Sequence, residues 1–166
     1  MDDAFFMKKA LEAAKRALAE GEFPVGCVVT YQGEIIAAGS RKNTKRDFTN
    51  ELDHAEMVAL KRLAKLRQDT DTSKATIFCT MEPCLMCLGA IILSGIRQIV
   101  FAYEDVMGGG TTCDLTKLPP LYANSRISIT PNVLRAESLA LLKTYFSDPA
   151  NSYWQGSLLA GYTLSQ

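Results

Sequence analysis

The sequence lacks a long apolar run, an excess of charge of either sign and any internal repeat. No apolar run reaches the length that a helix needs to span a bilayer, and the first residues, Met1-Asp2-Asp3-Ala4, are acidic where a signal peptide is basic. We therefore predict no membrane association and a cytoplasmic location. The 18 basic and 18 acidic side chains cancel, so the chain has no overall attraction for a long nucleic acid.

Histidine is scarce, and a disulfide framework is missing. The chain has a single histidine, His54, and five cysteines, an odd number that does not fit complete pairing. Thiols stay reduced in the cytoplasm. We therefore expect cysteines to be available as metal ligands.

Strand and helix patterns alternate along the chain, which predicts one domain over residues 1–166. Apolar spacing predicts a helix over residues 4–19, and the turn signal Gln32-Gly33 predicts a hairpin of strands 25–31 and 34–39. An antiparallel hairpin followed by this alternation indicates an α/β sandwich with a mixed sheet. The other predicted elements are a helix from 53 to about 67, a strand over 75–80, a helix over 85–94, strands over 98–103 and 127–130, a helix over 136–146, loops over 40–52 and 104–126, and an apolar tail beyond residue 149.

Two short segments contain the residue types of a metal site, His54-Ala55-Glu56 and Pro83-Cys84-Leu85-Met86-Cys87. The C-x-x-C pair begins a predicted helix, so both sulfur atoms can reach one ion and the helix N-terminus favours their thiolates. Structural zinc sites use four protein ligands, whereas catalytic sites use three and leave a position for water. Cys27, Cys79 and Cys113 have no paired spacing. The predicted ligands of one zinc ion per chain are therefore His54, Cys84 and Cys87.

Glu56 is the predicted proton carrier of this site. An open zinc site lowers the pKa of its bound water from 15.7 to about 7, and the reaction then needs a general acid or base. Glu56 lies two residues from His54, near the metal but outside its ligand set. The backbone amide of Cys84, at a helix N-terminus, is predicted to stabilise charge on the attacking oxygen. We expect Glu56 and Cys84 to be the catalytic residues.

The H-x-E…P-C-x-x-C pattern of these segments is the signature of the zinc nucleobase deaminases. Over about residues 5–103 the chain resembles the cytidine/deoxycytidylate deaminase superfamily, in the branch that contains the bacterial tRNA adenosine deaminases. The resemblance implies a three-layer α/β/α sandwich with a mixed five-stranded sheet, zinc as cofactor and a homodimer. Besides the metal segments, it rests on Glu22-Phe23-Pro24-Val25-Gly26, Asn43 and Thr80-Met81-Glu82-Pro83-Cys84.

The resemblance also implies which residues contact the substrate. Asn43 is expected to hydrogen-bond the base, Val25 and Gly26 to form one pocket wall, and the amide of Ala55 to face the base. The loop over 104–114 and the tail after Phe146 do not match the basic C-terminal helix of the tRNA enzymes.

Each motif also has a plainer interpretation. Asp53 and Glu56 have the spacing of a helix capping box, and a C-x-x-C pair also occurs in thioredoxin-like redox proteins. The run Gly108-Gly109-Gly110 is either a flexible loop or a phosphate-binding nest. A basic cluster is either a solvated face or a contact for phosphate or RNA, and its members are Arg41, Lys42, Lys45 and Arg46.

Together these patterns predict a zinc-dependent hydrolytic deaminase that releases the exocyclic amine of a nucleobase, nucleoside or nucleotide as ammonia. Zero net charge and a non-basic tail favour a small substrate, whereas the match over residues 22–26 favours an adenosine in a tRNA anticodon loop. The third alternative is a catalytically silent zinc protein, and the intact Glu56 argues against it. The aromatic residues within 152–162 either close the substrate pocket or belong to the core.

Overall fold

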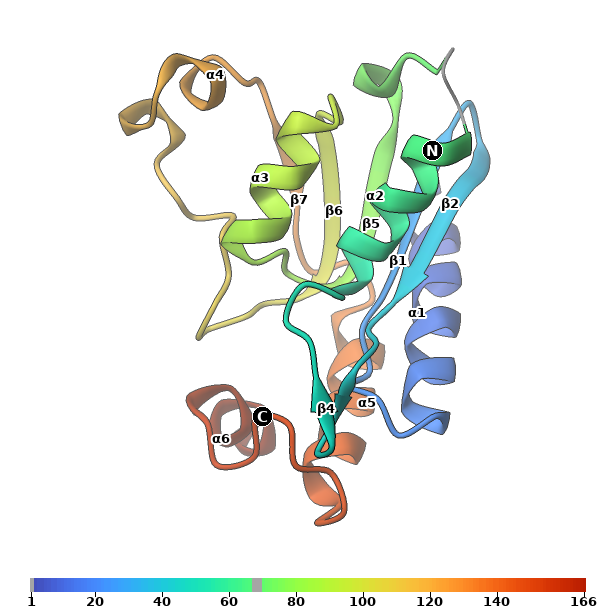
Figure 1. Ribbon diagram of the computed structural model, residues 1–166, viewed down its shortest axis with the longest axis vertical. Coiled ribbons are helices and arrows are strands. Elements are labelled where there is room, and N and C mark those ends of the chain that lie inside the picture. The colour runs from blue at the N-terminus through green and yellow to red at the C-terminus, as the bar shows by residue number, and fades with distance from the viewer. Residues whose placement is uncertain (1, 67–69) are drawn as a thin grey trace.

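The computed structural model describes residues 2–66 and 70–166 and shows a sheet between two layers of helices (Figure 1). The five strands of this sheet are β1 (Gly26–Tyr31), β2 (Glu34–Ser40), β5 (Thr76–Met81), β6 (Gln98–Tyr103) and β7 (Ser128–Thr130). Their order is β2-β1-β5-β6-β7. β1 is antiparallel to β2 and β5, whereas β5, β6 and β7 run parallel. The predicted mixed five-stranded sheet is confirmed.

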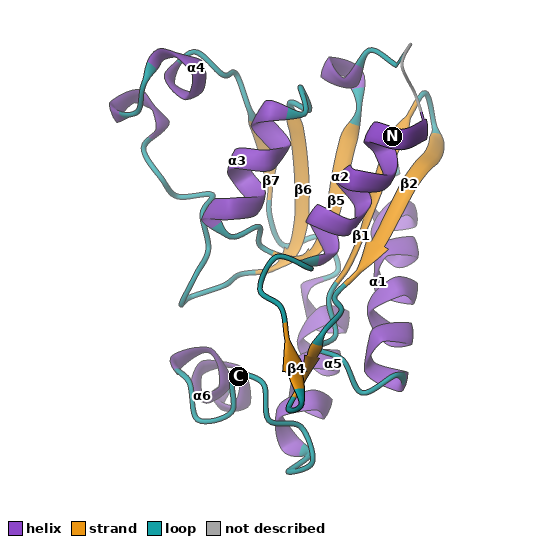
Figure 2. Cartoon of the chain, in the orientation of Figure 1, coloured by secondary structure: helices purple, strands orange, loops and turns teal. Residues whose placement is uncertain are grey.

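Helices cover both faces of the sheet (Figure 2). The helices α1 (Asp3–Ala19) and α5 (Arg135–Ser147) lie on one face, and α2 (Ala55–Leu66) and α3 (Leu85–Leu93) lie on the other. Neighbouring residues of the central strands point to opposite faces, so Val28 packs in the cluster with α1 and Val29 in the cluster with α2 and α3. None of the helices in the described residues is long and apolar enough to cross a membrane.

The turn between β1 and β2 confirms the predicted hairpin. Gln32 and Gly33 have φ angles of 52° and 81°. Positive φ at both central residues is typical of a type I′ turn, whose twist matches that of the strands. Gly26 pairs with Ser40, so the ladder extends one residue beyond the predicted end of the second strand.

The structure also contains short elements in segments expected to be irregular. The segment 40–52 forms a hairpin of β3 (Thr44–Lys45) and β4 (Phe48–Thr49), the loop over 104–126 contains α4 (Pro120–Ala123), and the tail contains α6 (Leu158–Ser165). The sequence does contain local signals for two of them. A proline begins α4, and the Ser157 side chain accepts a hydrogen bond from the amide of Ala160 at the start of α6.

Some predicted boundaries differ by one or two residues from those in the structure. The helix expected from residue 53 begins at Ala55, two residues later. Its predicted end at Arg67 lies outside the described residues. The strand expected over 127–130 begins at Ser128.

Gly26 allows α1 to lie directly against β1. A Cβ atom at this position lies 2.1 Å from the carbonyl oxygen of Ala10 and 2.6 Å from the backbone nitrogen of Ala14. Because both are backbone atoms, the helix has to move to admit a side chain. We expect Gly26→Ala to lower the free energy of unfolding by about 1–3 kcal/mol, as overpacking does. Urea denaturation measures the loss. Gly89→Ala is the control, since a Cβ there meets nothing within 4 Å, and equal losses in both variants would contradict the packing argument.

The C-terminal helix α6 is attached to the body of the protein through Glu104. This carboxylate accepts hydrogen bonds from Nε of Arg135 (2.8 Å) and from the hydroxyl of Tyr162 (2.6 Å). The hydroxyls of Tyr103 and Thr163 are 3.1 Å apart. The hydrogen bond from Arg135 is the main cause that lowers the pKa of Glu104 to about 2.

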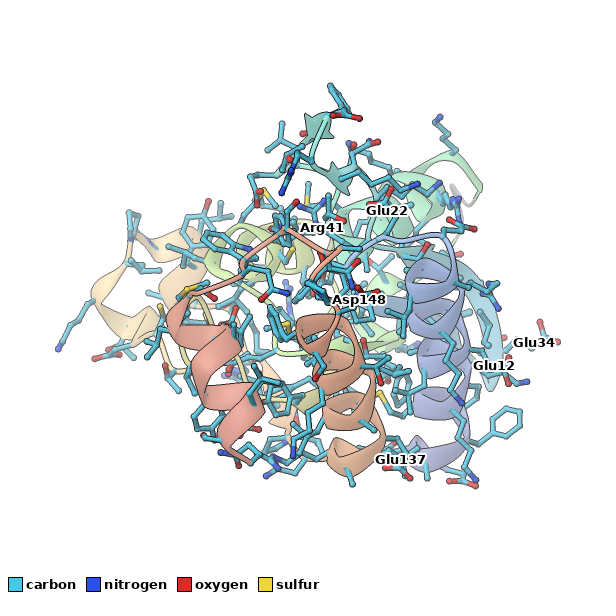
Figure 3. All side chains as sticks on the ribbon, turned by 90° about the horizontal axis from the view of Figure 1, so that it is seen from below. Glu12, Glu22, Glu34, Arg41, Glu137 and Asp148 are labelled. Atoms are coloured by element: carbon cyan, nitrogen blue, oxygen red, sulfur yellow. The ribbon has the colours of Figure 1, made fainter. Side chains whose placement is uncertain are left out.

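We expect acid to weaken this attachment. Because its pKa is lowered, Glu104 stabilises the fold above the ordinary carboxyl pKa of 4.5, and this contribution is lost as the pH falls from there through about 2. Glu104→Gln should lower the free energy of unfolding at neutral pH by about 1.5–3 kcal/mol, the value of hydrogen bonds to charged groups, and flatten the acid limb of the stability curve. Urea denaturation over a pH series measures both. Glu137→Gln, an exposed glutamate of α5 (Figure 3), should retain the wild-type curve.

Candidate functional site

His54, Cys84 and Cys87 come together where two helices begin. His54 directly precedes α2, Cys84 is the N-cap residue of α3, and Cys87 lies in the first turn of α3. The Nδ1 atom of His54 is 3.5 Å from the Sγ atom of Cys84 and 3.6 Å from that of Cys87. Tetrahedral zinc, with Zn–S bonds of about 2.3 Å and Zn–N bonds of about 2.0–2.1 Å, separates a sulfur and a nitrogen ligand by about 3.6 Å. The three predicted ligands therefore have the spacing that zinc requires.

The two thiols differ in pKa in this arrangement. Hydrogen bonds from Cys87 and from His54 lower the pKa of Cys84 to about 4, so at neutral pH Cys84 is a thiolate, the form that binds metal. Hydrogen bonding to this thiolate raises the pKa of Cys87. A thioredoxin-like redox pair needs no histidine at this position, so the contact with His54 favours the metal interpretation.

Glu56 points from the first turn of α2 towards the cysteines. It is 3% exposed, and its Oε2 atom accepts a hydrogen bond from the thiol of Cys87 at 3.5 Å. Burial raises the pKa of this carboxyl group, which lets it hold a proton more readily than an exposed glutamate. The amide of Asp53 donates to the carbonyl oxygen of Asn50 (3.2 Å). The reciprocal contact expected of a capping box is therefore replaced by a contact between Glu56 and the metal ligands.

A cavity of about 140 Å³ lies beside the ligand set. Its volume is close to the ~150 Å³ of a cavity that binds benzene, so its inner part accommodates a flat aromatic ring. The predicted site residues that line it are Val25, His54, Ala55, Glu56 and Cys84.

Asn43 and Gly26, the other two predicted substrate contacts, are not among the residues that line this cavity. The side-chain amide of Asn43 donates to the carboxylate of Asp53 at 2.6 Å. Gly26 faces α1, and its amide donates to the hydroxyl of Thr80 at 3.0 Å. In the structure, Asn43 fixes the loop before α2 and Gly26 permits the close approach of α1.

The basic cluster expected from the sequence is divided in the structure. Lys42, Lys45 and Arg46 are exposed, whereas Arg41 is 3% exposed and lines the cavity. The guanidinium group of Arg41 donates to the hydroxyl of Tyr153 (3.2 Å) and lies 5.2 Å from the centre of its ring. The two residues are 112 positions apart, so no local pattern could have separated Arg41 from its exposed neighbours.

Glu51 connects Arg41, Tyr153 and His54. Its Oε2 atom accepts a hydrogen bond from the hydroxyl of Tyr153 (2.9 Å) and lies 3.6 Å from Nη2 of Arg41 and 3.7 Å from Nε2 of His54. Metal-bound histidines generally direct their second ring nitrogen at a carboxylate, a carbonyl oxygen or water, which fixes the ring. Glu51 lies on the side of His54 where such a supporting group belongs.

The C-terminal segment forms part of the cavity wall. Tyr153, Trp154 and Leu159 line the cavity, whereas Tyr162 packs against the core. Trp154 has a φ angle of 57° and remains 43% exposed. Residues 149–166 contain no charged side chain.

The triple-glycine loop folds around the carboxylate of Glu82. This carboxylate accepts hydrogen bonds from the amide of Asp105 (3.0 Å) and from the amide and hydroxyl of Thr111. The amides of residues 108–110 donate to oxygen atoms of Asp105 and Pro83. Because all three amides are used within the chain, none is free to bind a phosphate. A Cβ atom on Gly109 would lie 2.4 Å from Oε2 of Glu82, so close packing accounts for this glycine.

Comparisons with known proteins agree with the geometry of the site. Residues 1–103 match the family model of the cytidine and deoxycytidylate deaminase zinc-binding region. The chain is 32% identical over 146 residues to a tRNA-specific adenosine deaminase of Bacillus subtilis (strain 168), a match that covers 88% of this chain and 89% of that protein. It is 32% identical over 152 residues to a tRNA-specific adenosine deaminase of Aquifex aeolicus (strain VF5), covering 92% and 99%.

Solved structures show the same fold. A structure from work on A-to-I editing by tRNA:A34 deaminases has a TM-score of 0.67 and 26% identity, covering 79% of this chain and 99% of that one. The guanine deaminase of Nitrosomonas europaea has a TM-score of 0.66 and 27% identity, covering 84% and 81%. With its zinc-type ligand set and this fold, the chain belongs to the cytidine and deoxycytidylate deaminase family, in the tRNA adenosine deaminase-like branch, and is a hydrolytic deaminase that acts on C–N bonds.

Proposed function

We propose that this enzyme deaminates a free nucleobase or nucleoside and holds one zinc ion per chain with His54, Cys84 and Cys87. Zinc bound there supplies a water molecule whose pKa is lowered to about 7. The three ligand atoms lie within 4.8 Å of one another, and no fourth histidine, cysteine or carboxylate joins them among the described residues. This set of three ligands leaves one coordination position of a tetrahedral zinc ion for water.

Glu56 moves the protons of the reaction. Its carboxylate takes one proton from the water and passes it to the ring nitrogen beside the amine-bearing carbon. It then takes the second proton from the same oxygen, now bonded to that carbon, and delivers it to the amine, which leaves as ammonia. Its burial and raised pKa suit a carboxyl group that must both accept and donate a proton. The backbone amide of Cys84, at the start of α3, is the donor that we assign to the charge developing on oxygen. Val25 and Ala55 form the wall against which the base lies.

The preference for a small substrate rests on the uncharged C-terminal segment in the cavity wall. Phosphate contacts from Lys and Arg dominate the affinity of proteins for nucleic acids. Residues 149–166 have no charged side chain, and the net charge of the chain is zero. A free base instead needs a mostly apolar, concave pocket with a few polar groups, which describes a cavity that combines Tyr153, Trp154 and Leu159 with Arg41.

An adenosine in a tRNA anticodon loop is the second candidate. The relatives from Bacillus subtilis and Aquifex aeolicus, each 32% identical to this chain, are named as tRNA-specific adenosine deaminases. Three exposed basic residues that follow Arg41 are available for phosphate contacts, namely Lys42, Lys45 and Arg46.

Ammonia release from a panel of free bases, nucleosides, nucleotides and an anticodon stem-loop tests the proposal. We expect turnover of a small substrate that barely changes with salt, because few phosphates are engaged. A tRNA substrate would instead show affinity falling steeply with salt, with a log–log slope of about −0.7 to −0.9 for each phosphate contact. The triple variant Lys42→Gln, Lys45→Gln, Arg46→Gln should leave small-substrate turnover unchanged. Deamination of the stem-loop alone, lost in this variant, would overturn the proposal.

A further inference from the structure

Arg41 is a buried cation in the cavity wall with donors that remain unused. A guanidinium group has five N–H donors. Nη1 donates to the carbonyl oxygens of Lys42 and Asn50, and Nη2 donates to the hydroxyl of Tyr153. Within residues 2–66 and 70–166, Nε makes no hydrogen bond and Nη2 makes only the one to Tyr153, although Nη2 also forms an ion pair with Glu51 at 3.6 Å. Two donors are therefore available to a ligand.

The donors of Nη1 and those of Nη2 point in different directions. Nη1 faces the backbone of the segment 42–50, whereas Nη2 faces Tyr153 and Glu51, which both line the cavity. Nε and Nη2 form one edge of the planar group, on which Nε makes no hydrogen bond within the described residues and Nη2 makes one. Figure 3 shows Arg41 beside the chain segment that follows Asp148, and the ring of Tyr153 in this segment lies 5.2 Å from the guanidinium carbon. The C-terminal segment thus lies against the guanidinium group.

The two parallel N–H donors on one edge of an arginine side chain complement guanine but not adenine. Arginine binds O6 and N7 of guanine with two parallel hydrogen bonds, whereas the corresponding edge of adenine has an amine donor beside N7 and is matched by Asn or Gln. The amine-bearing carbon of guanine, C2, lies across the six-membered ring from this edge. A guanine held by Arg41 therefore presents C2, rather than C6, to Glu56 and the metal ligands.

We infer that Arg41 is a specificity-determining residue that selects a guanine-type base, with oxygen at C6 and an amine at C2. The inference rests on the proposed function, a small substrate, and names its class. In the reaction the bond between C2 and the amine nitrogen breaks and a bond between C2 and the water oxygen forms, which yields xanthine and ammonia. Tyr153 and Glu51 are positioning residues that act through Arg41. Adenine is disfavoured because its amine would meet the donors of Arg41 and leave them unpaired.

Kinetics with guanine, 2-aminopurine and adenine test this inference. The base 2-aminopurine has the same amine at C2 but lacks O6. We expect the zinc-loaded enzyme to prefer guanine in kcat/KM. Arg41→Met and Arg41→Lys should each raise KM for guanine about 10- to 100-fold, as expected for lost hydrogen bonds to a charged group, with a much smaller change in kcat. In both variants the preference in kcat/KM for guanine over 2-aminopurine should be lost. Tyr153→Phe should raise KM less, because the ring remains.

The control is Arg46→Met, which removes an exposed arginine of the same segment and should keep the wild-type preference. Zinc content and thermal unfolding establish that each variant is folded and loaded. If Arg41→Met fails to fold, Arg41→Lys tests the inference instead. Lysine keeps the positive charge but lacks the two parallel N–H donors of a guanidinium edge. An unchanged preference in folded Arg41→Lys overturns the inference. Turnover by the wild type of another free base but not guanine overturns it and leaves the proposed function intact, whereas turnover of the stem-loop alone overturns both.

Discussion

Glu56→Gln is expected to lower kcat by about 10²–10⁴-fold, the usual contribution of general acid–base catalysis, while zinc content stays at the wild-type level. Glutamine has nearly the same volume but cannot carry a proton between water, ring nitrogen and amine. Glu56 is buried and contacts Cys87, yet it is not one of the three proposed ligands, so its replacement leaves the metal held. Ammonia release and metal analysis of the same preparation measure both quantities.

Glu12→Gln is the control for loss of a carboxylate. Glu12 lies on the exposed side of α1 (Figure 3) and pairs only with Lys9 (2.9 Å) among the described residues, so kcat and zinc content should not change. Urea denaturation of both variants separates a catalytic role from a structural one. Retained turnover with lost stability in Glu56→Gln would show that the role of Glu56 is structural.

The metal site could be predicted because each half of it is local. His54 and Glu56 share the start of one helix, and Cys84 and Cys87 share the start of another. Residue type and spacing are enough to recognise such pairs, and helix N-termini favour thiolates. The central strands were equally recognisable, because strands covered on both faces are continuous apolar runs.

The substrate side of the cavity could not be predicted, because tertiary contacts build it. Arg41 has the same sequence context as its exposed neighbour Lys42, and tertiary contacts, including one with Tyr153 of the C-terminal segment, bury it. Asn43 has a side chain suited to a base, and in the structure its amide donates to Asp53. Gly26 allows a close approach, and the sequence does not say that the approaching group is a helix rather than a ligand.

Removal of either cysteine ligand should abolish stoichiometric zinc binding. Cys84→Ala and Cys87→Ala each leave two of the three proposed ligands. The loss of affinity should exceed the 10- to 100-fold that typically follows mutation of a residue that only supports a ligand. Metal analysis after dialysis should find about one zinc per chain in the wild type and much less in either variant. Cys113→Ala, which removes an exposed free cysteine outside the ligand set, should retain the wild-type content.

Stability supplies a second measurement that does not depend on activity. Zinc at 100 times its Kd stabilises the folded state by about 2.7 kcal/mol, because the assembled ligand set exists only in the fold. A chelator should therefore lower the free energy of unfolding of the wild type and of Cys113→Ala by about this amount and leave Cys84→Ala unchanged. Full zinc occupancy in Cys84→Ala, or an equal chelator response in all three proteins, would place the metal elsewhere and remove the basis for Glu56 as its proton carrier.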